Sequence, residues 1–472
     1  MSSGPFRVII VGGGPSGITA AHALHHAGID FVVLERRTNI VEDLGASLVL
    51  GAPSLRIFHQ FGILDNLMEI GGKLHENKGF TVDGYAFKHA ETLAIFKANS
   101  HVRVSQIACS LTNSSPSSSH GAEPVAFHRA HLIGALYDGL PEAAKSKYFT
   151  GKKLAGIVST ETGVTVKCED GSSYDGSIVI GADGVHSATR RQMRKLAVAE
   201  DPSREKTWDA EKPFKTLYQC MWASFPRPTE TGQSYETSGT DNSAMYITGK
   251  DRGWIFLYEK LPEPTTERIS FTDEQLDAFA GRFADWPITD TLKVKDVYKE
   301  RFNAGGAGLE EGLCEHWSWN GRVVLVGDAA HKFTPNAGLG FNNGVQDVVA
   351  LCNRLQKFVS GSANEANSKT PDFSALEAQF EAYRQERRER VEQDLEQSAR
   401  VTRMHAWAST WDWIMSRYVM SWSFVQQLFI TFIVSPNAQK SGVLDFISAT
   451  EPFEGTYKWL HPLKSIKNGG SV

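Results

Sequence analysis

The chain has 472 residues, of which 41% are hydrophobic and 22% are charged, and its formal net charge is −5. This balance is typical of a globular protein of two or three domains with a large core. Lysine and arginine form no long runs, so nucleic acid is not an expected partner. The five cysteines are scattered without a C-x-x-C pair, which argues against a structural zinc site or a disulfide framework, and no metal is expected.

The first stretch expected to form a site is RVIIVGGGPSGITAAHALHHAGIDFVVLER, at 7–36. Its apolar start predicts a buried parallel strand, and Gly12, Gly14 and Gly17 then form a G-x-G-x-x-G turn into a helix. In such a turn the first glycine permits the tight bend, the second lets a pyrophosphate approach and the third lets helix pack on strand. A second strand ends at Glu35, whose carboxylate is placed to accept ribose hydroxyls. The pattern predicts a dinucleotide site without distinguishing FAD from NAD.

The next segments are less regular. Gly45 and Ala46 are small residues where the backbone could pass close to a flat ligand. Residues 79–96 alternate like a hairpin, and residues 114–119 indicate a polar surface loop, either an insertion without a role or a substrate lid. Arg129 begins an expected helix; because cations are disfavoured at a helix N-terminus, either an anionic partner or simple solvation would account for it.

Two later strands also end in acidic residues. One leads into Gly-Ala-Asp-Gly, which contains Asp183, and the segment GRVVLVGD ends at Asp328. The carboxyl ends of parallel strands line ligand crevices, so both carboxylates are candidates for a cofactor site. Between them, 213–300 alternates as expected of an antiparallel sheet in a separate domain. Residues 374–404 predict a charged amphipathic helix.

Three motifs in this order resemble single-component flavin monooxygenases of the para-hydroxybenzoate hydroxylase type: GGGPSG, GADGVHSATR and GRVVLVGDAAHKFTPNAGLGFNNGVQD. The resemblance covers most of the chain and implies FAD, with the first motif holding its AMP half and Asp328 its ribityl chain. It places Gly338, Gly340 and Phe341 at the isoalloxazine edge, although the family's usual glutamine is Leu339 here. It also ties Asp183 to FAD and the nicotinamide cofactor.

The same resemblance sets Arg129 against the flavin. The full set of expected cofactor-binding residues is Gly12, Gly14, Gly17, Glu35, Arg36, Gly45, Ala46, Arg129, Asp183, Asp328, Gly338, Gly340 and Phe341.

The expected fold is α/β, with a Rossmann-like FAD-binding domain, a mostly antiparallel β-sheet substrate domain and a C-terminal helical region. The chain is expected to cross between the first two domains more than once. The expected segments are 1–80, 126–200 and 306–372 for the FAD-binding domain, 81–125 and 201–305 for the substrate domain, and 373–472 for the helical region.

The resemblance implies that NADPH or NADH reduces FAD, that O₂ then gives a C4a-hydroperoxyflavin, and that its distal oxygen passes to an electron-rich carbon. Within the family the chain looks closest to fungal secondary-metabolite enzymes, including indole and meroterpenoid epoxidases. This implies epoxidation of an indole C2=C3 or prenyl double bond in a bulky apolar natural product. An aromatic (phenol) hydroxylase of the same family is the alternative, and a flavin dehydrogenase is a further one.

Two other classes fit less well. A halogenase would be expected to show a Trp-x-Trp-x-x-Ile motif, which Trp411-Asp412-Trp413-Ile414 does not match. A non-catalytic NAD-binding sensor would leave the Gly-Asp motif unexplained.

Arg190 and Tyr218 are the candidates for stabilising charge during oxygen transfer. Arg190 occupies the family's arginine position after Asp-Gly, where a contact to FAD or to the surface is the alternative role. Tyr218 matches a tyrosine assigned to catalysis in some meroterpenoid enzymes, and a core tyrosine with a satisfied hydroxyl is the alternative. Asp43 is a third candidate.

The C-terminal segment is rich in tryptophan, and 418–439 contains no charged residue. Its length approaches the roughly 20 residues that span a bilayer, and tryptophans favour the interface, but polar residues interrupt it. We expect one side of a helix to pack on the flavin domain, with lying on a membrane surface or crossing the membrane as alternatives. That side would carry Trp422, Phe424, Leu428, Phe429 and Phe432. Because the first strand begins within about seven residues, no secretory signal is expected, and the expected location is cytoplasmic.

Overall fold

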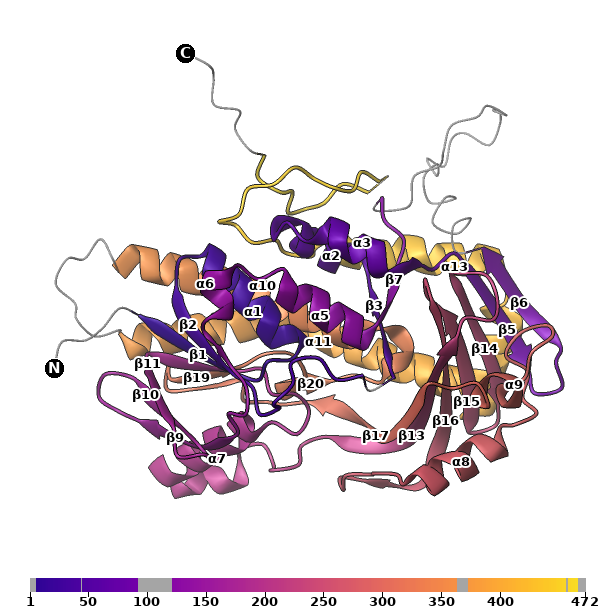
Figure 1. The fold of residues 1–472 in the computed structure, drawn as a ribbon, viewed down its shortest axis with the longest axis horizontal. Helices are drawn as coiled ribbons and strands as arrows, with labels where there is room; N and C mark the ends of the chain where they lie inside the picture. The colour runs from indigo at the N-terminus through magenta and orange to yellow at the C-terminus, as the bar shows by residue number, and fades with distance from the viewer. Residues whose placement is uncertain (1–5, 44, 92–120, 363–371, 456, 466–472) are drawn as a thin grey trace, which may run out of the picture.

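The computed structural model describes residues 6–43, 45–91, 121–362, 372–455 and 457–465. In this part of the chain two large sheets lie side by side, and one long helix spans both (Figure 1). The expected polar loop at 114–119 and the fifth cysteine lie outside the described residues.

The first large sheet has the strand order β18-β19-β12-β1-β2-β8 and is parallel except for the β18–β19 pair. Its strands are β1 (Arg7–Val11), β2 (Asp30–Leu34), β8 (Tyr148–Phe149), β12 (Ile178–Gly181), β18 (Ser318–Trp319) and β19 (Val323–Leu325). The central strands are short β-branched runs with no exposed side chain in their interiors, as expected of strands covered on both faces. The carboxyl ends of β1, β12 and β19 therefore meet at one edge, where the glycine turn, Asp183 and Asp328 follow them.

Helices cover one face of this sheet, and a smaller sheet lies on the other (Figure 1). The covering helices are α1 (Pro15–His26), α5 (Arg129–Asp138), α6 (Glu142–Lys145) and α10 (Leu339–Ser362). The other face carries β9 (Leu154–Ser159), β10 (Val164–Cys168), β11 (Ser173–Gly176) and α7 (Ala188–Glu200). The helices α2 (Ala52–Gln60) and α3 (Leu64–Ile70) pack beside α10 and α5.

The second large sheet has the order β20-β17-β13-β16-β15-β14-β5-β6, and all its pairs are antiparallel except β14 with β5. Its strands are β5 (Glu76–Thr81), β6 (Ala86–Glu91), β13 (Lys215–Pro226), β14 (Gln233–Gly239), β15 (Asn242–Thr248), β16 (Arg252–Thr265), β17 (Asn303–Leu313) and β20 (His331–Lys332). The chain thus enters this sheet at residue 76, before the expected boundary at 80.

Two helices lie within the stretch that we expected to be mostly antiparallel sheet. They are α8 (Asp273–Arg282) and α9 (Val294–Tyr298), and they pack on the outer face of the second sheet through Phe279, Val294 and Val297. A capping box at Thr272 and Gln275 starts α8, so a sequence signal for this helix was present but missed. The opposite, inner face of the second sheet packs against β7 (Val125–His128) and β3 (Ser47–Leu50). These two strands pair with each other.

The first large sheet and its helices are called the flavin side here, after the expected cofactor. The long helix α11 (Phe373–His405) contacts α10 and β18 on this side and β17 and β14 of the second sheet, so it joins the two halves of the molecule. Beyond it the chain breaks into α12 (Thr410–Ile414), a π-helical turn (Met415–Val419), α13 (Ser423–Phe429), a second π-helical turn (Ile430–Val434) and α14 (Ser435–Gln439). Within the described ranges no single helix is long and apolar enough to cross a membrane. The helical segments Thr410–Val419 and Phe424–Gln439 reach the required length and composition only when taken together, and the chain bends by 105° between them.

Candidate cofactor and substrate site

The three glycines of the G-x-G-x-x-G turn are needed for different structural reasons. Gly12 has φ +105°, and a Cβ there would lie 2.5 Å from the carbonyl oxygen of Ala182, so the β12 loop packs against it. A Cβ on Gly17 would overlap the carbonyl of Gly12, because α1 crosses the turn closely. A Cβ on Gly14, by contrast, would meet no protein atom within 4 Å. Protein packing therefore requires the first and third glycines, and the open side at Gly14 fits a pyrophosphate at the start of α1.

Glu35 holds the turn from the end of β2. Its carboxylate is buried and accepts hydrogen bonds from the backbone N–H of Gly13 at 2.7 Å and of Arg37 at 2.8 Å. Tyr148 donates its hydroxyl to the carbonyl of the same Gly13 at 2.7 Å. Each carboxylate oxygen keeps a further acceptor position for a ribose hydroxyl. Arg36, next in sequence, is exposed.

Asp328 follows β19 at the edge where the parallel strands end. Its Oδ2 pairs with Lys332 Nζ at 2.5 Å, and a Cβ on Gly340 would lie 3.8 Å from its Oδ1. The Gly-Asp loop and the start of α10 thus lie together, as the flavin assignment requires.

Arg129 begins α5, and its backbone N–H donates to Ala46 at 3.0 Å, which ties the small-residue loop to the helix. Its guanidinium forms no ion pair or hydrogen bond with a described residue. Burial lowers the pKa of Arg129, and the negative charge of Asp328 acts in the opposite direction. A half-buried cation within electrostatic range of Asp328 that pairs with no described residue fits an acceptor-rich ligand such as the flavin.

A left-handed residue, Gly338, with φ +64°, comes directly before helix α10. Asn342, one turn into the helix, donates to the carbonyls of Gly338 at 2.7 Å and Val49 at 2.9 Å, so it fixes both the helix start and β3. Phe341 lies 6.2 Å from Phe58, between ring centroids, and packs against the core of the flavin side. Phe341 therefore has a packing role in the structure. Its expected contact with the flavin stays a prediction.

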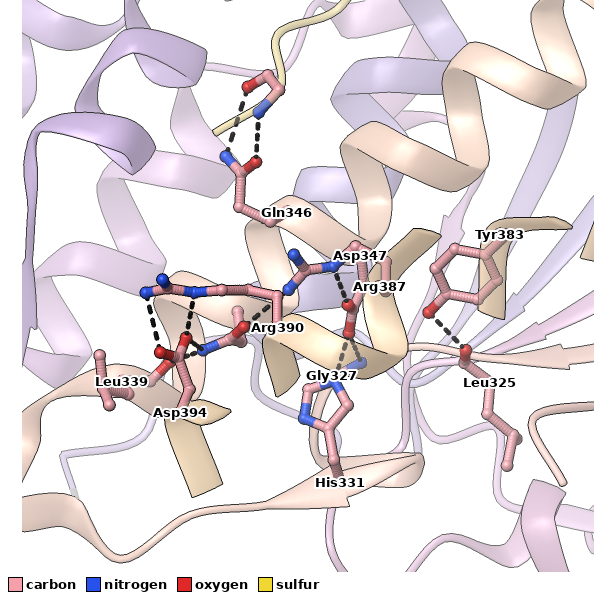
Figure 2. Close-up of polar contacts among 12 residues, drawn as sticks. Leu325, Gly327, His331, Leu339, Gln346, Asp347, Tyr383, Arg387, Arg390 and Asp394 are labelled. Atoms are coloured by element: carbon pink, nitrogen blue, oxygen red, sulfur yellow. Dashed lines mark hydrogen bonds and ion pairs between the residues drawn. The ribbon is translucent and has the colours of Figure 1, made fainter. Parts of the chain in front are cut away.

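A buried ionic network, not anticipated from the sequence, supports the Gly-Asp loop (Figure 2). Asp347 of α10 is fully buried; its Oδ2 accepts from the backbone N–H of Gly327 at 2.9 Å and lies 2.6 Å from His331 Nε2. Its Oδ1 accepts from Arg387 of α11 at 2.9 Å. Burial alone would raise the pKa of Asp347, but His331 and Arg387 outweigh burial and hold the pKa at about 2. One carboxylate therefore joins the loop, α10 and α11.

The network extends about one helical turn along α10 and about two along α11. Arg387 also donates to Asn343 Oδ1 at 2.6 Å, and Asn343 donates to Asp394 Oδ2 at 2.9 Å. Asp394 is paired with Arg390 at 2.8 Å (Figure 2). The i, i+4 spacing of Asn343 and Asp347, on the side of the helix that continues into the apolar run Val348–Cys352, was the sequence signal that could have identified them.

Arg190 and Asp183 hold the middle motif together. The guanidinium of Arg190 is buried and donates to the carbonyls of Ala329 and Val185, both at 2.8 Å, which joins the Gly-Asp and Asp-Gly loops. Asp183 accepts from Ser187 Oγ at 2.5 Å and from the backbone N–H of Thr189 at 2.9 Å, at the start of α7. These contacts give both residues a positioning role; a catalytic role for Arg190 and a cofactor contact for Asp183 stay predictions.

Asp43 links the small-residue loop to the second sheet. Its Oδ1 accepts from Gly45 N–H at 3.0 Å and Asn303 Nδ2 at 2.9 Å and lies 3.0 Å from His128 Nε2. Its Oδ2 lies 3.2 Å from Arg252. Although burial raises its pKa, the bonds from Asn303 and Gly45 outweigh that effect and lower it. A carboxylate with this many partners is suited to joining the halves rather than to taking a proton.

The inner face of the second sheet is apolar and lies against the flavin side. Side chains from β13, β15 and β16 form one cluster there, which Val49 of β3 and Ala406 at the end of α11 complete. We call this cluster the inner face: Leu74, Ala126, Tyr218, Cys220, Met245, Ile247, Trp254, Phe256, Tyr258, Leu309 and Ala406. A Cβ on Gly338 would lie 3.5 Å from Val49 Cβ, so the inner face adjoins the start of α10.

Several polar atoms on the inner face are buried without a hydrogen-bonding partner in the described part of the chain. They include the hydroxyls of Tyr218 and Tyr258 and the indole N–H of Trp254. Burial raises the pKa of Tyr218 to about 12 and that of Tyr258 well above its usual value, so both hydroxyls stay protonated near neutral pH. A buried hydroxyl without a partner costs roughly 1–3 kcal/mol, and a ligand that accepts from it would recover that energy.

Comparison with known proteins agrees with this geometry. A protein-family model described as "FAD binding domain" matches residues 6–398. The chain is 32% identical over 430 residues to the FAD-dependent monooxygenase dpchE of Colletotrichum higginsianum, covering 89% of this chain and 85% of that one. It is 47% identical over 201 residues to the FAD-dependent monooxygenase SAT1 of Stachybotrys chartarum, covering 42% of this chain and 66% of that one.

The fold is also found among solved structures. Klebsiella pneumoniae HpxO, complexed with FAD and uric acid, superposes with a TM-score of 0.65 at 19% identity, covering 92% of this chain and 97% of that one. The expected α/β fold, the resemblance to flavin monooxygenases and to fungal members among them, and FAD as cofactor are confirmed. The chain belongs to the FAD-binding-domain family and is an FAD-dependent monooxygenase.

Proposed function

We propose that the enzyme uses NADPH or NADH to insert one oxygen atom of O₂ into an electron-rich double bond of a bulky apolar natural product, as an epoxidase of fungal secondary metabolism. The bound flavin supplies the activation of O₂. The observation that carries the proposal is the inner face, which is apolar, adjoins the start of α10 and holds buried hydroxyls without partners. A small polar substrate would leave most of this surface without complementary contacts.

The inner face would bind and orient the substrate. Trp254, Phe256 and Met245 offer flat and adaptable apolar surface for a polycyclic or prenylated skeleton. The hydroxyls of Tyr218 and Tyr258 are buried behind this surface, and a substrate oxygen that comes within reach of one would accept a hydrogen bond and so fix which double bond lies toward the cofactor. The same apolar surface excludes water from the reacting centre.

Cations around the Asp-Gly loop support the proposal that NADPH or NADH, both of which carry phosphate, binds there. Burial lowers the pKa of His186, and Arg268, Arg190, Arg36 and Arg191 lower it further, so four guanidinium groups lie close enough to act on one imidazole. Arg36, Arg191 and Arg268 are exposed, and exposed arginine forks are suited to binding a phosphate.

The proposal is tested by incubating FAD-loaded enzyme with NADPH, ¹⁸O₂ and candidate prenylated indole alkaloids. We expect substrate-dependent NADPH oxidation and a product that carries one labelled oxygen. A product without label would contradict monooxygenation of that substrate. Labelled hydroxylation of phenolic compounds alone would instead assign the aromatic-hydroxylase alternative, for which a protonated Tyr218 beside a phenol is the favouring feature.

A further inference from the structure

The C-terminal arm, defined here as Thr410–Gln439, exposes an unusual amount of apolar surface. Fourteen large hydrophobic residues are exposed in the described part of the chain, and eight of them lie in this arm. They are Trp411, Ile414, Tyr418, Trp422, Phe424, Leu428, Phe432 and Ile433. Phe432, Trp411 and Trp422 are 71%, 68% and 68% exposed, respectively. The expectation that this apolar side packs on the flavin domain is therefore wrong.

The polarity of the arm is reversed relative to a helix on a water-soluble surface. Its buried residues, among those whose side chains are described, are Ser416, Gln426 and Ser435, all polar. Gln426 donates to the carbonyl of Met420 at 2.7 Å, so its amide bonds within the arm itself. An amphipathic helix in water would turn these residues outward and bury the aromatic ones. This arrangement is stable only if the outer side contacts an apolar medium.

The chemistry of the arm fits a lipid surface. Tyr418 to Gln439 contains no charged residue, and Arg417 and Lys440 flank that stretch, where cations can meet anionic headgroups. The exposed tryptophans and tyrosine, which favour the membrane–water interface, lie mostly in the first half of the arm, and phenylalanine, leucine and isoleucine, which favour the acyl region, in the second. Each bent arm is shorter than the roughly 20 residues needed to cross a bilayer. A helix pair bent by 105° is better suited to lying in the interface.

The arm is also close to the proposed substrate surface. Ala406, at the end of α11 and just before the arm, packs in the inner face. Tyr85, at the β5–β6 turn, is 58% exposed and lies 5.1 Å from Arg417, measured from its ring centroid to the guanidinium carbon. The exposed apolar surface therefore continues from the arm onto the second sheet.

We propose that the C-terminal arm binds the surface of a lipid bilayer and holds the enzyme there without spanning the membrane. The position next to the inner face would let an apolar substrate pass from the bilayer to the cofactor. The membrane contact itself depends only on the arm and is independent of which substrate the enzyme oxidises.

The test is flotation of full-length, FAD-loaded enzyme with vesicles of phosphatidylcholine, with and without phosphatidylserine, and with the protein followed by its flavin absorbance. We expect the parent to float with both vesicles and more strongly with the anionic ones. The double variant Trp422→Ser/Phe432→Ser should lose at least tenfold in partitioning while keeping its flavin. Leu460→Ser removes a 61% exposed leucine outside the arm and should float like the parent.

Four results would overturn the proposal. The parent could stay at the bottom at every lipid composition, or the double variant could float like the parent. Protein that alkaline carbonate does not release from the vesicles would show that the arm spans the bilayer. A lipid-free dimer that the double substitution dissociates, combined with no vesicle binding, would assign the surface to a second copy of the chain.

Discussion

The two sides of the active centre treat their buried polar groups differently. Around the Gly-Asp loop, Asp347, Arg387 and Asn343 each bond to at least two partners, and Asp347 accepts from the loop backbone itself. On the inner face, Tyr218 and Tyr258 are buried, and their hydroxyls bond to no described residue.

This difference indicates what each side binds. The network around Asp347 joins several protein groups, although His331 Nδ1 bonds to no described residue, and it rigidifies the loop that must hold the same cofactor in every turnover. Polar atoms left without protein partners destabilise the fold slightly and are retained where a ligand completes them. The comparison predicts that substitutions on the flavin side cost stability and FAD together, whereas substitutions of the inner hydroxyls cost catalysis alone.

The largest effect is expected for Asp347→Asn. Removing the charge leaves His331 and Arg387 buried beside a neutral amide, and breaking a buried ion pair typically costs about 3–5 kcal/mol. Thermal unfolding with and without added FAD should show a large loss of stability and weaker FAD retention. As a control, Glu381→Gln on α11 removes the ion pair between Glu381 and Arg384. The side chain of Glu381 is 42% exposed, so this change should cost less than about 1 kcal/mol.

The same carboxylate predicts an acid limit of stability. The pKa of Asp347 in the folded protein, about 2, lies below its ordinary value of 3.8, because His331 and Arg387 favour the charged form. Its contribution is therefore fully present above about pH 4 and is lost as the pH falls toward 2. Unfolding curves of the parent should steepen in that interval, and Asp347→Asn should reduce this steepening. An unchanged acid profile in the variant would contradict the assignment.

A second comparison lies within the glycine turn. Gly17→Ala introduces a Cβ into the Gly12 carbonyl and should destabilise the protein by about 1–3 kcal/mol even without FAD. Gly14→Ala meets open space, so the apoprotein should keep its melting temperature while FAD affinity falls at least tenfold, or about 1.4 kcal/mol. Equal effects of the two variants on the apoprotein would show that the open side at Gly14 is not the pyrophosphate site.

Arg190→Lys separates positioning from catalysis at the middle motif. A lysine cannot reach the carbonyls of Ala329 and Val185 together, so the melting temperature should fall by the equivalent of about 1–2 kcal/mol. If Arg190 only joins the loops, kcat at saturating FAD should stay within about threefold of the parent. A fall in kcat of tenfold or more with unchanged stability would restore the catalytic assignment.

Much of the flavin side could be predicted from the sequence. The G-x-G-x-x-G turn, Glu35 and Asp328 each follow a buried β-branched strand, and the carboxyl ends of parallel strands are brought together by the sheet itself. The partners of Asp347 could not be predicted, because Arg387 lies on α11, 40 residues later, and pairing between helices depends on tertiary packing.

The C-terminal arm shows where periodicity alone fails. Trp422, Phe424 and Phe432 predict an apolar face, but a hydrophobic pattern does not say whether the face meets the protein or the surroundings. The inward-facing Ser416, Gln426 and Ser435 decide that question, and two π-helical turns, Met415–Val419 and Ile430–Val434, interrupt the α-helical period along this stretch. Such turns have no strong local sequence signal.

The smallest change tests the central claim most directly, namely that the hydroxyls of the inner face are kept for the substrate. Tyr218→Phe removes one buried hydroxyl without a described partner, so stability should stay the same or rise by up to about 1 kcal/mol. The decisive measurement is the amount of ¹⁸O-labelled product formed per NADPH oxidised, compared between parent and variant with the same substrate. We predict at least a threefold lower ratio for Tyr218→Phe; a parent-like ratio would contradict the account.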